Sequence, residues 1–376
     1  MSLRDRIFSP GPKKLLAIDG GGIRGVLALE ILAKIEAIFS KGRENYVLAD
    51  DFDYIAGTST GGIIAAGLSY GKSVSELMKF YNDSGPKMFE KEWLLKRLYA
   101  DFKSEPLAQK LKEVFGADTT LGSDKLRTLL LLVVRNATTD SPWPISNNPF
   151  AKYNDPKRKN CNLNIPLWQL VRASTAAPTY FPPEAIEIGD KIHLFVDGGM
   201  TVYNNPAFQM VLMATLDRYW PLAPEGKRGW VTGEKDMLVV SVGTGLAPIA
   251  NEALTAANMH LLYNANNVPA ALMNAAQFEQ DMLCRVFGKC LCGDGLDREL
   301  NDMIGASGLI PEKRFTYARY NAELSKAGLE RLGCGHIDPA SISDLAAVST
   351  ISQLREVGKA CAEQHVKATH FEEFLT

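Results

Sequence analysis

Three short glycine-rich turns constrain the fold of this chain more than any other feature. Each follows a short apolar run that predicts a buried β-strand, and the turns are residues 19–25 (DGGGIRG), 57–62 (GTSTGG) and 197–199 (DGG). The middle turn has the Gly-x-Ser-x-Gly spacing, in which a serine occupies a sharp bend between a strand and a helix. Gly57 and Gly61 flank Ser59 because such a bend leaves no room for a Cβ atom. Ser59 is therefore the first candidate nucleophile.

In order and spacing the three turns resemble those of the patatin-like phospholipases, acyl hydrolases that use a Ser-Asp dyad in place of a triad. The resemblance covers roughly the first 245 residues and includes three lesser features, residues 176–181 (AAPTYF), 204–206 (NNP) and 239–245 (VVSVGTG). A lone Gly-x-Ser-x-Gly motif recurs by chance, whereas three turns in this order are specific. The resemblance implies a three-layer patatin-like fold and hydrolysis of acyl esters in membrane phospholipids.

Apolar periodicity predicts strands that alternate with helices. The predicted strands are residues 14–18, 52–56, 129–134, 193–196 and 237–242, and the main predicted helices are 23–39, 60–68, 166–176, 252–286 and 341–365. This order predicts an α/β fold with a mainly parallel central sheet and helices on both faces. We expect a catalytic core over residues 13–245 and a mainly helical C-terminal extension over residues 246–376.

Composition excludes several classes of function. The chain has 376 residues and a formal charge of -2, so bulk charge gives no attraction to a nucleic acid polymer. The N-terminus lacks the apolar stretch of a signal peptide, and no run approaches the ~20 apolar residues of a membrane span. We therefore expect a cytoplasmic protein that acts at the inner face of the cell membrane by peripheral contact. The sequence leaves the oligomeric state open, a homo-oligomer included.

The six cysteines predict reduced thiols, because no secretory signal accompanies them. Cys290, Cys292, Cys334 and His336 are soft ligands, but their spacing does not match the usual zinc motifs. We therefore predict no metal site and no resident cofactor.

A serine hydroxyl needs a base to accept its proton and donors to stabilise the oxyanion. Asp197, which precedes Gly198 and Gly199, is the candidate base, and a carboxylate serves this role only where water is excluded. The first turn opens a helix, so its amides and the helix dipole can face an anion. In patatin-like enzymes the corresponding loop is the oxyanion hole, which the resemblance carries to Gly20, Gly21, Gly22, Arg24 and Gly25, with the elbow amide of Thr60. Arg24 either holds the loop or a lipid phosphate, or forms an ion pair with Asp19 or another carboxylate at the edge of the core.

Three other readings of the same residues remain open. The Gly-x-Gly-x-x-Gly spacing of residues 20–25, with acidic residues over 44–53, also fits dinucleotide binding in a Rossmann fold, but that reading leaves the other two turns unexplained. A Ser-His-Asp triad would need His260 or His336 to complete the chain order Ser, Asp, His. A catalytically idle scaffold is the third reading, although every residue of the dyad is present.

Two surfaces are candidates for contact with lipid or a small anionic ligand. Residues 87–99 mix aromatic and basic side chains as an interfacial helix does, and a buried amphipathic helix explains the same pattern. Segments 167–181 and 315–320 look like the bacterial patatin-like effectors of antiphage systems, which a cyclic dinucleotide activates. Such a ligand needs basic groups beside stacking surfaces. The candidate ligand residues are Tyr153, Lys157 and Arg158 in one segment and Arg314, Tyr317 and Arg319 in another.

Overall fold

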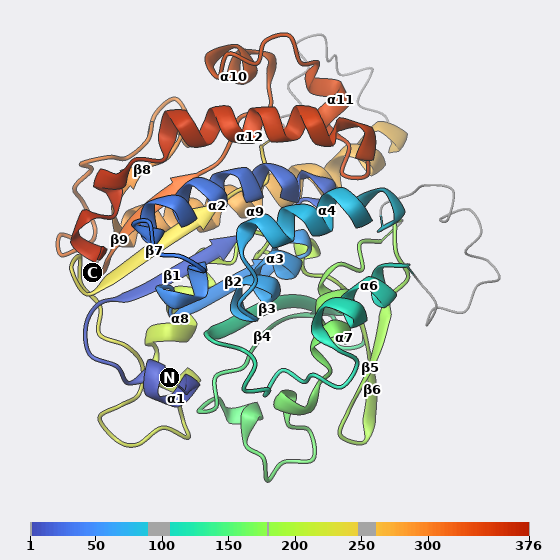
Figure 1. The fold of residues 1–376 in the computed structure, drawn as a ribbon, viewed down its shortest axis with the longest axis vertical. Coiled ribbons are helices and arrows are strands. Elements are labelled where there is room, and N and C mark those ends of the chain that lie inside the picture. The colour runs from blue at the N-terminus through green and yellow to red at the C-terminus, as the bar shows by residue number, and fades with distance from the viewer. Residues whose placement is uncertain (1, 89–105, 179, 247–260, 376) are drawn as a thin grey trace.

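A nine-stranded sheet forms the middle of the molecule (Figure 1). The structure is a computed structural model that describes residues 2–88, 106–178, 180–246 and 261–375. Its strand order is β5-β6-β3-β2-β1-β7-β9-β8, and β4 pairs with β3. The strands are β1 (Lys13–Ile18), β2 (Tyr54–Thr58), β3 (Leu129–Asn136), β4 (Ser141–Ser146), β5 (Glu184–Ile188), β6 (Lys191–Asp197), β7 (Met237–Val242), β8 (Gly288–Cys292) and β9 (Phe315–Tyr320).

Most strand pairs are parallel, and this confirms the predicted mainly parallel sheet. The β1–β2, β1–β7, β2–β3, β7–β9 and β8–β9 pairs run parallel, while β4, β5 and β6 supply the antiparallel pairs. Every residue of β1, β2 and β7 is buried, as expected for strands that helices cover on both faces. Because these strands are buried on both faces, their sequences are continuous apolar runs, and these runs allowed the strands to be predicted.

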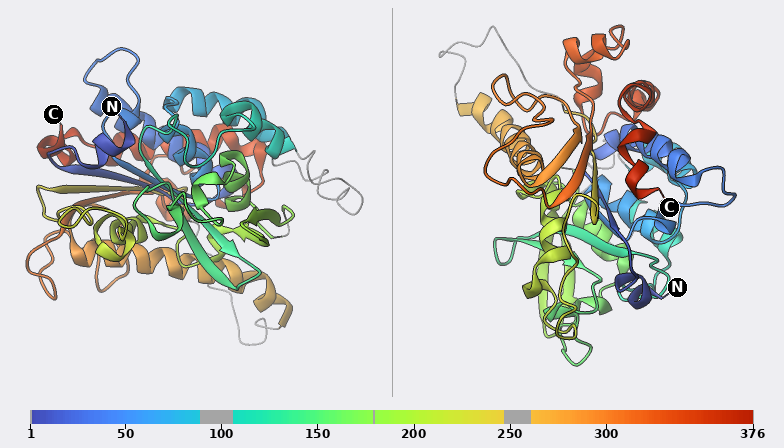
Figure 2. Two further views of the ribbon diagram at one scale, coloured as in Figure 1. Left: turned by 90° about the horizontal axis from the view of Figure 1, so that it is seen from below. Right: turned by 90° about the vertical axis from the view of Figure 1, so that its left-hand side faces the viewer.

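Helices cover the two faces of the sheet and complete the predicted three layers (Figures 1 and 2). On one face Leu16, Ile18 and Leu132 pack with α2, α3, α4, α6 and α7, while on the other Leu15 and Ala17 pack with α8 and α9. The helices are α1 (Leu3–Ile7), α2 (Gly25–Ser40), α3 (Thr60–Ser69), α4 (Val74–Met88), α6 (Pro106–Phe115), α7 (Leu167–Ser174), α8 (Ala207–Thr215), α9 (Leu261–Phe287), α10 (Lys326–Arg331), α11 (Pro339–Ser343) and α12 (Ile351–His365).

The C-terminal part of the chain packs on the core through α12 and also extends the sheet. α12 lies against α2, where a Cβ atom at Gly358 would approach the Leu27 carbonyl oxygen to 2.7 Å, so the helices are in close contact. Beyond the predicted boundary at residue 245, β9 pairs with β7, and β8 pairs with β9. The residues after 245 therefore contribute two strands to the central sheet as well as helices.

Two strands meet end to end beside β3 and thereby position the site. β2 ends with Thr58 opposite Val133, and β6 runs in from the other direction and ends with Asp197 opposite Val134. Neighbouring residues of β3 thus hold the ends of both strands. The turns that follow β2 and β6 must lie side by side.

Candidate active site

Ser59 occupies the sharp turn between β2 and α3 that its motif predicts. Its backbone has φ 56° and ψ -125°, a region that non-glycine residues seldom adopt and that marks functional strain. A Cβ atom at Gly57 would lie 2.0 Å from the Gly61 carbonyl oxygen, and one at Gly61 would lie 2.3 Å from the Ile18 carbonyl oxygen. Both flanking glycines are therefore required by close backbone approach.

The Ser59 hydroxyl donates a hydrogen bond to Oδ2 of Asp197 at 2.6 Å. The second carboxylate oxygen, Oδ1, accepts from the Gly199 amide at 2.6 Å, so both oxygens are held. A Cβ atom at Gly198 would lie 2.2 Å from the Val133 carbonyl oxygen, which explains why the turn after Asp197 begins with glycine. The candidate nucleophile and the candidate base are thus within hydrogen-bonding distance, as base catalysis requires.

Burial makes Asp197 a stronger base than an exposed carboxylate. Desolvation raises the pKa of Asp197 from 3.8 to about 6, while the hydrogen bonds from Ser59 and the Gly199 amide and the charge of Arg172 act in the opposite direction. A base is most effective when its pKa lies near the working pH. The carboxyl group is therefore mostly ionised at neutral pH and is a stronger base than an exposed aspartate.

Amides without an acceptor adjoin the dyad at the first glycine turn. A Cβ atom at Gly20 would lie 3.3 Å from Cβ of Ser59, so the turn borders the nucleophile. The Gly20 amide donates to the Asn204 carbonyl oxygen and the Gly25 amide to that of Gly22, whereas the Gly21 and Gly22 amides donate to no acceptor within the described residues. Among the predicted oxyanion-hole residues of this turn, the amides of Gly21 and Gly22 are therefore free to bind an oxyanion, and those of Gly20 and Gly25 are already engaged. The Thr60 amide, at the start of α3, likewise has no acceptor in the described chain.

Arg24 does not form the predicted alternative ion pair. Asp19 pairs instead with Arg319, with Nη1 2.9 Å from Oδ1 and Nη2 2.5 Å from Oδ2. The Nε atom of Arg24 is buried and has no hydrogen-bond partner among the residues described. Burial lowers the pKa of Arg24 to about 10, against the effect of the Asp19 charge, so the guanidinium is protonated at neutral pH. Its role toward a lipid phosphate stays a prediction.

The histidines do not build a triad in the described part of the chain. His193 Nδ1 lies 3.1 Å from Asn136 Nδ2, and His336 Nε2 lies 3.2 Å from Glu356 on an exposed surface. His370 shares a hydrogen bond with the Tyr320 hydroxyl, and His260 lies outside the described residues.

Within the same described ranges no three His, Cys, Asp or Glu side chains gather into a metal site. All six cysteines, Cys290, Cys292 and Cys334 included, are free thiols.

One of the two predicted ligand clusters is closed to any ligand. Tyr317 and Arg319 lie on β9, which is buried on both faces between β7 and β8. The Tyr317 hydroxyl donates to Asp281, while Arg319 holds Asp19, so both act as core residues. Arg314 is exposed just before this strand. The prediction that Tyr317 and Arg319 bind a ligand is therefore wrong, because the side chains of a strand inside a covered sheet do not reach solvent.

The other cluster is accessible but lies far from the dyad along the sheet. The Tyr153 side chain is 48% exposed, the Arg158 guanidinium lies 5.1 Å from its ring centroid, and Lys157 is exposed. These residues follow β4, whose last residue pairs with Leu131 near the start of β3. Ser59 lies at the opposite end of the parallel strands, so a ligand here would act from a distance.

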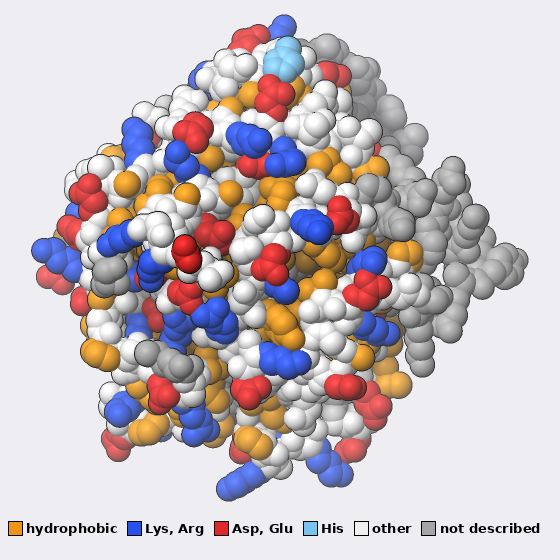
Figure 3. Space-filling view, in the orientation of Figure 1, with side chains coloured by type: hydrophobic (Ala, Val, Ile, Leu, Met, Phe, Trp, Pro, Cys, Tyr) orange, Lys and Arg blue, Asp and Glu red, His pale blue; other side chains and the backbone are white. Residues whose placement is uncertain are grey.

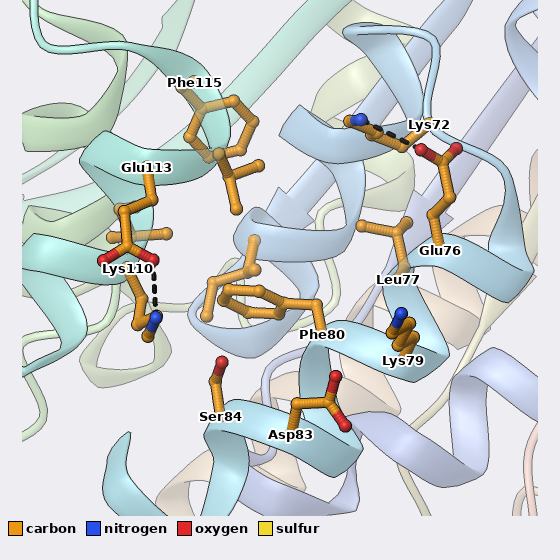
Figure 4. A pocket seen from close by; sticks show the side chains of 13 residues that line it. Lys72, Glu76, Leu77, Lys79, Phe80, Asp83, Ser84, Lys110, Glu113 and Phe115 are labelled. Atoms are coloured by element: carbon orange, nitrogen blue, oxygen red, sulfur yellow. Dashed lines mark hydrogen bonds and ion pairs between the residues drawn. The ribbon is translucent and has the colours of Figure 1, made fainter.

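A cleft of about 440 Å³ lies between α4 and α6 (Figure 4). Its apolar floor includes Ile63, one helical turn after Ser59 on α3, and Phe80. Figure 4 shows the ion pairs of Lys72 with Glu76 and of Lys110 with Glu113 at its rim. Three lysines and three acidic residues line it, so the cleft carries no net charge for an anionic ligand.

Most of the predicted interfacial segment, residues 89–99, lies outside the described residues.

Two residues that support the site were missed in the sequence. The Ser174 hydroxyl accepts from the Ser59 amide at 2.9 Å and donates to the Val133 carbonyl oxygen at 2.7 Å, which fixes the elbow. The Asn204 carbonyl oxygen holds the Gly20 amide, and its side chain is buried against the same loop. Ser174 lies in segment 167–181 and Asn204 in segment 204–206, both of which carry the family resemblance. That resemblance was the sequence signal that could have identified them.

Comparison with known proteins identifies the family. A profile described as patatin-like phospholipase matches residues 16–211, a range that includes all three glycine turns. The chain is 32% identical over 240 residues to a cGAMP-activated phospholipase of Escherichia coli, covering 61% of this chain and 62% of the relative. It is 34% identical over 209 residues to a cGAMP-activated phospholipase of Vibrio cholerae, covering 52% and 56%. The mouse (Mus musculus) 85/88 kDa calcium-independent phospholipase A2 is 30% identical over 249 residues, 62% of this chain and 27% of the relative. The matches thus span about 60% of the two bacterial relatives.

Proposed function

This chain belongs to the patatin-like phospholipase family, and we propose that it hydrolyses acyl ester bonds of membrane phospholipids through a Ser59–Asp197 dyad. The observation that carries the proposal is the 2.6 Å hydrogen bond from the strained Ser59 elbow to Asp197. The unengaged amides of the neighbouring glycine turn supply the second requirement, which is stabilisation of an oxyanion.

In the acylation step Asp197 accepts the hydroxyl proton while Oγ of Ser59 bonds to the ester carbonyl carbon. The carbonyl oxygen becomes an oxyanion, and the Gly21 and Gly22 amides donate hydrogen bonds to it. The bond to the glycerol oxygen then breaks, and this oxygen takes the proton from Asp197 and leaves as lysophospholipid. The acyl group remains on Ser59.

In the deacylation step water replaces the alcohol. Asp197 accepts a proton from the water as its oxygen bonds to the acyl carbon, and the oxyanion forms again at the same amides. When the bond to Ser59 breaks, Oγ recovers the proton and the fatty acid leaves. Each turnover thus consumes one water and restores the Ser59–Asp197 hydrogen bond.

The test is mass spectrometry of phospholipids incubated with the purified protein and its variants in the presence of a panel of cyclic dinucleotides, so that an activator is available. We expect free fatty acid and lysophospholipid from the unchanged protein, and neither from Ser59→Ala or Asp197→Asn, because the members of a dyad act as one unit. The exposed Ser343→Ala and Asp118→Asn are matched controls that should keep full activity. Substantial hydrolysis by a folded Ser59→Ala variant would contradict the proposal.

We also propose that a cyclic dinucleotide switches this activity on, as in an antiphage effector that degrades the membrane from its cytoplasmic face. The support is that two relatives are named cGAMP-activated phospholipases. The exposed group of Tyr153, Lys157 and Arg158 is the remaining candidate site, since its ring and cations match the bases and phosphates of such a ligand. The alternative is a constitutive lipid or lysophospholipid esterase.

Phospholipid hydrolysis with and without a panel of cyclic dinucleotides separates these alternatives. Activation by one member, and its loss in the Lys157→Glu/Arg158→Glu variant, is the expected result. Full activity without nucleotide, unchanged by every member, would establish the constitutive alternative.

A further inference from the structure

Large apolar side chains are exposed on both sides of the catalytic aspartate. Ile192 is 66% exposed and Leu194 is 46% exposed on β6, while Met200 and Val202, just after Asp197, are 44% and 45% exposed. Monomeric proteins rarely expose clustered apolar side chains without an interaction that uses them. Four such residues within eleven positions therefore need an explanation.

The strand geometry places Ile192 and Leu194 together on one open face of the β5–β6 hairpin. Leu194 pairs with Ala185 and Ile192 with Glu187, and all four are exposed. The opposite face carries Ile186 and Phe195, which are buried in the cluster that includes α7. The hairpin is thus attached to the core by one face and leaves the other uncovered.

This hairpin projects past the end of the sheet at which the dyad lies. β6 pairs with only the last residues of β3, from Val134 to Asn136, and its remaining residues continue beyond that end. β5 is the last strand of the sheet on this side, so the hairpin stands at the margin of the molecule (Figure 1).

α9 adds a further exposed side chain next to the turn after Asp197. Leu272 is 65% exposed. Its neighbour Met273 adjoins the turn, since a Cβ atom at Gly199 would lie 3.5 Å from Cε of Met273. α9, with Leu272, thus lies beside the turn that follows Asp197, and the hairpin leads into that turn from the other end.

We propose that Ile192, Leu194, Met200, Val202 and Leu272, here called the apolar rim, insert into the surface of a phospholipid bilayer and bring the dyad to its substrate. This inference rests on the proposed function, because a lipid ester has to leave the bilayer directly into the site. A second protein copy on the apolar rim would cover the turn that carries Asp197 and obstruct that path. Burial of aliphatic side chains in the headgroup region supplies the binding energy.

The charges near the hairpin indicate what kind of bilayer binds. Glu184, Glu187 and Asp190 outnumber Lys191, so the hairpin is net negative. In the orientation of Figure 1, acidic and basic side chains are interspersed over the surface (Figure 3), in keeping with the formal charge of -2. Insertion of apolar side chains, rather than attraction to anionic headgroups, therefore drives binding. We expect binding to zwitterionic phosphatidylcholine vesicles that changes little with salt.

The test compares Ile192→Glu and Leu194→Glu with Val231→Glu in the full chain. Val231 is 75% exposed and precedes β7, at the end of the strands away from Ser59, so it is a matched control. Each rim substitution should weaken co-sedimentation with phosphatidylcholine vesicles at least tenfold, since burial of one such side chain contributes that much. Hydrolysis of a monomeric short-chain ester should not change.

Two results would overturn the inference. One is vesicle binding that is unchanged in the rim variants or equally reduced in Val231→Glu. The other is light scattering that shows the rim variants dissociating an oligomer while vesicle binding persists, which would assign the apolar rim to a second copy. Failure of the proposed function is a separate result, namely no hydrolysis of the monomeric ester by the unchanged protein, and vesicle binding is measured independently of it.

Discussion

Asp197 has to satisfy two opposing physical demands. The proposed catalysis needs a carboxylate that is ionised at working pH and held against Ser59, whereas burial disfavours its charge. Only the Gly199 amide and the Ser59 hydroxyl hydrogen-bond to the carboxylate in the described structure, so solvation by the protein is partial. Two measurable effects of pH follow from this compromise.

The first concerns rate. Because Asp197 must be ionised to accept the proton, kcat/KM on a monomeric ester should rise with pH around an apparent pKa of about 6 and level off above neutrality. Steady-state kinetics from pH 4 to 9 with a soluble substrate measures this. A kcat/KM that rises instead around pH 4 would show that burial does not raise the pKa of Asp197.

The second concerns stability. The pKa of Asp197 is raised in the folded state, so its contribution favours folding at low pH and is lost as pH rises through about 6. Asp197→Asn removes the buried charge and keeps the shape, and should raise the free energy of unfolding at pH 8 by on the order of 2–3 kcal/mol. The gain should vanish near pH 4. Urea denaturation at both pH values checks it, and equal effects at the two pH values would contradict this account.

Residue types predicted that Ser59 and Asp197 lie together, but they did not predict the surroundings of β9. Ser59 and Asp197 were predictable because their glycine neighbours are dictated by backbone contacts that leave a mark in the sequence. Tyr317 and Arg319 look like ligand residues for as long as the position of their strand is unknown. Their partners Asp281 and Asp19 are distant in sequence, so no local pattern shows that they are buried.

At the scale of elements, the backbone of the glycine turn after β1 has a conformation that only glycine adopts without strain at position 22. Gly22 has φ +58°, and a Cβ atom there would lie 2.3 Å from the Leu345 carbonyl oxygen. Gly22→Ala should therefore displace the predicted oxyanion donors and lower kcat by ~10²–10³-fold with a smaller change in KM. Gly11→Ala is the control, since Gly11 also has positive φ but no atom lies within 4 Å of its added Cβ. Normal turnover by Gly22→Ala would exclude this loop as the oxyanion hole.

Three of the strands that the sequence did not reveal, β4, β8 and β9, share a weak local signal. β4 contains two prolines, which are tolerated because it pairs with β3 alone. β8 is short, begins with glycine and has a register shift between Cys290 and Cys292. β9 mixes Thr and Arg with aromatic residues. By contrast, the interior strands β1, β3 and β7 are continuous apolar runs and were predicted within a few residues of their bounds.

At the scale of the whole molecule, one buried ion pair joins the C-terminal strand β9 to the first glycine turn. Arg319 on β9 holds Asp19, the residue before the glycine turn. Arg319→Met should lower the free energy of unfolding by about 3–5 kcal/mol, because it leaves a buried carboxylate unpaired. Adding Asp19→Asn should recover part of this loss. Denaturation of both variants tests it, and a loss under 1 kcal/mol in Arg319→Met would show that the pair does not stabilise the molecule.

The central claim is that Asp197 activates Ser59 as the nucleophile. Labelling with an alkyl fluorophosphonate, followed by peptide mass spectrometry, tests it most directly because the reagent bonds to an activated serine Oγ. We predict one adduct, on Ser59, with a labelling rate at least 100-fold lower in Asp197→Asn and unchanged in Asp118→Asn. An adduct on another residue, or undiminished labelling of Ser59 in folded Asp197→Asn, would contradict it.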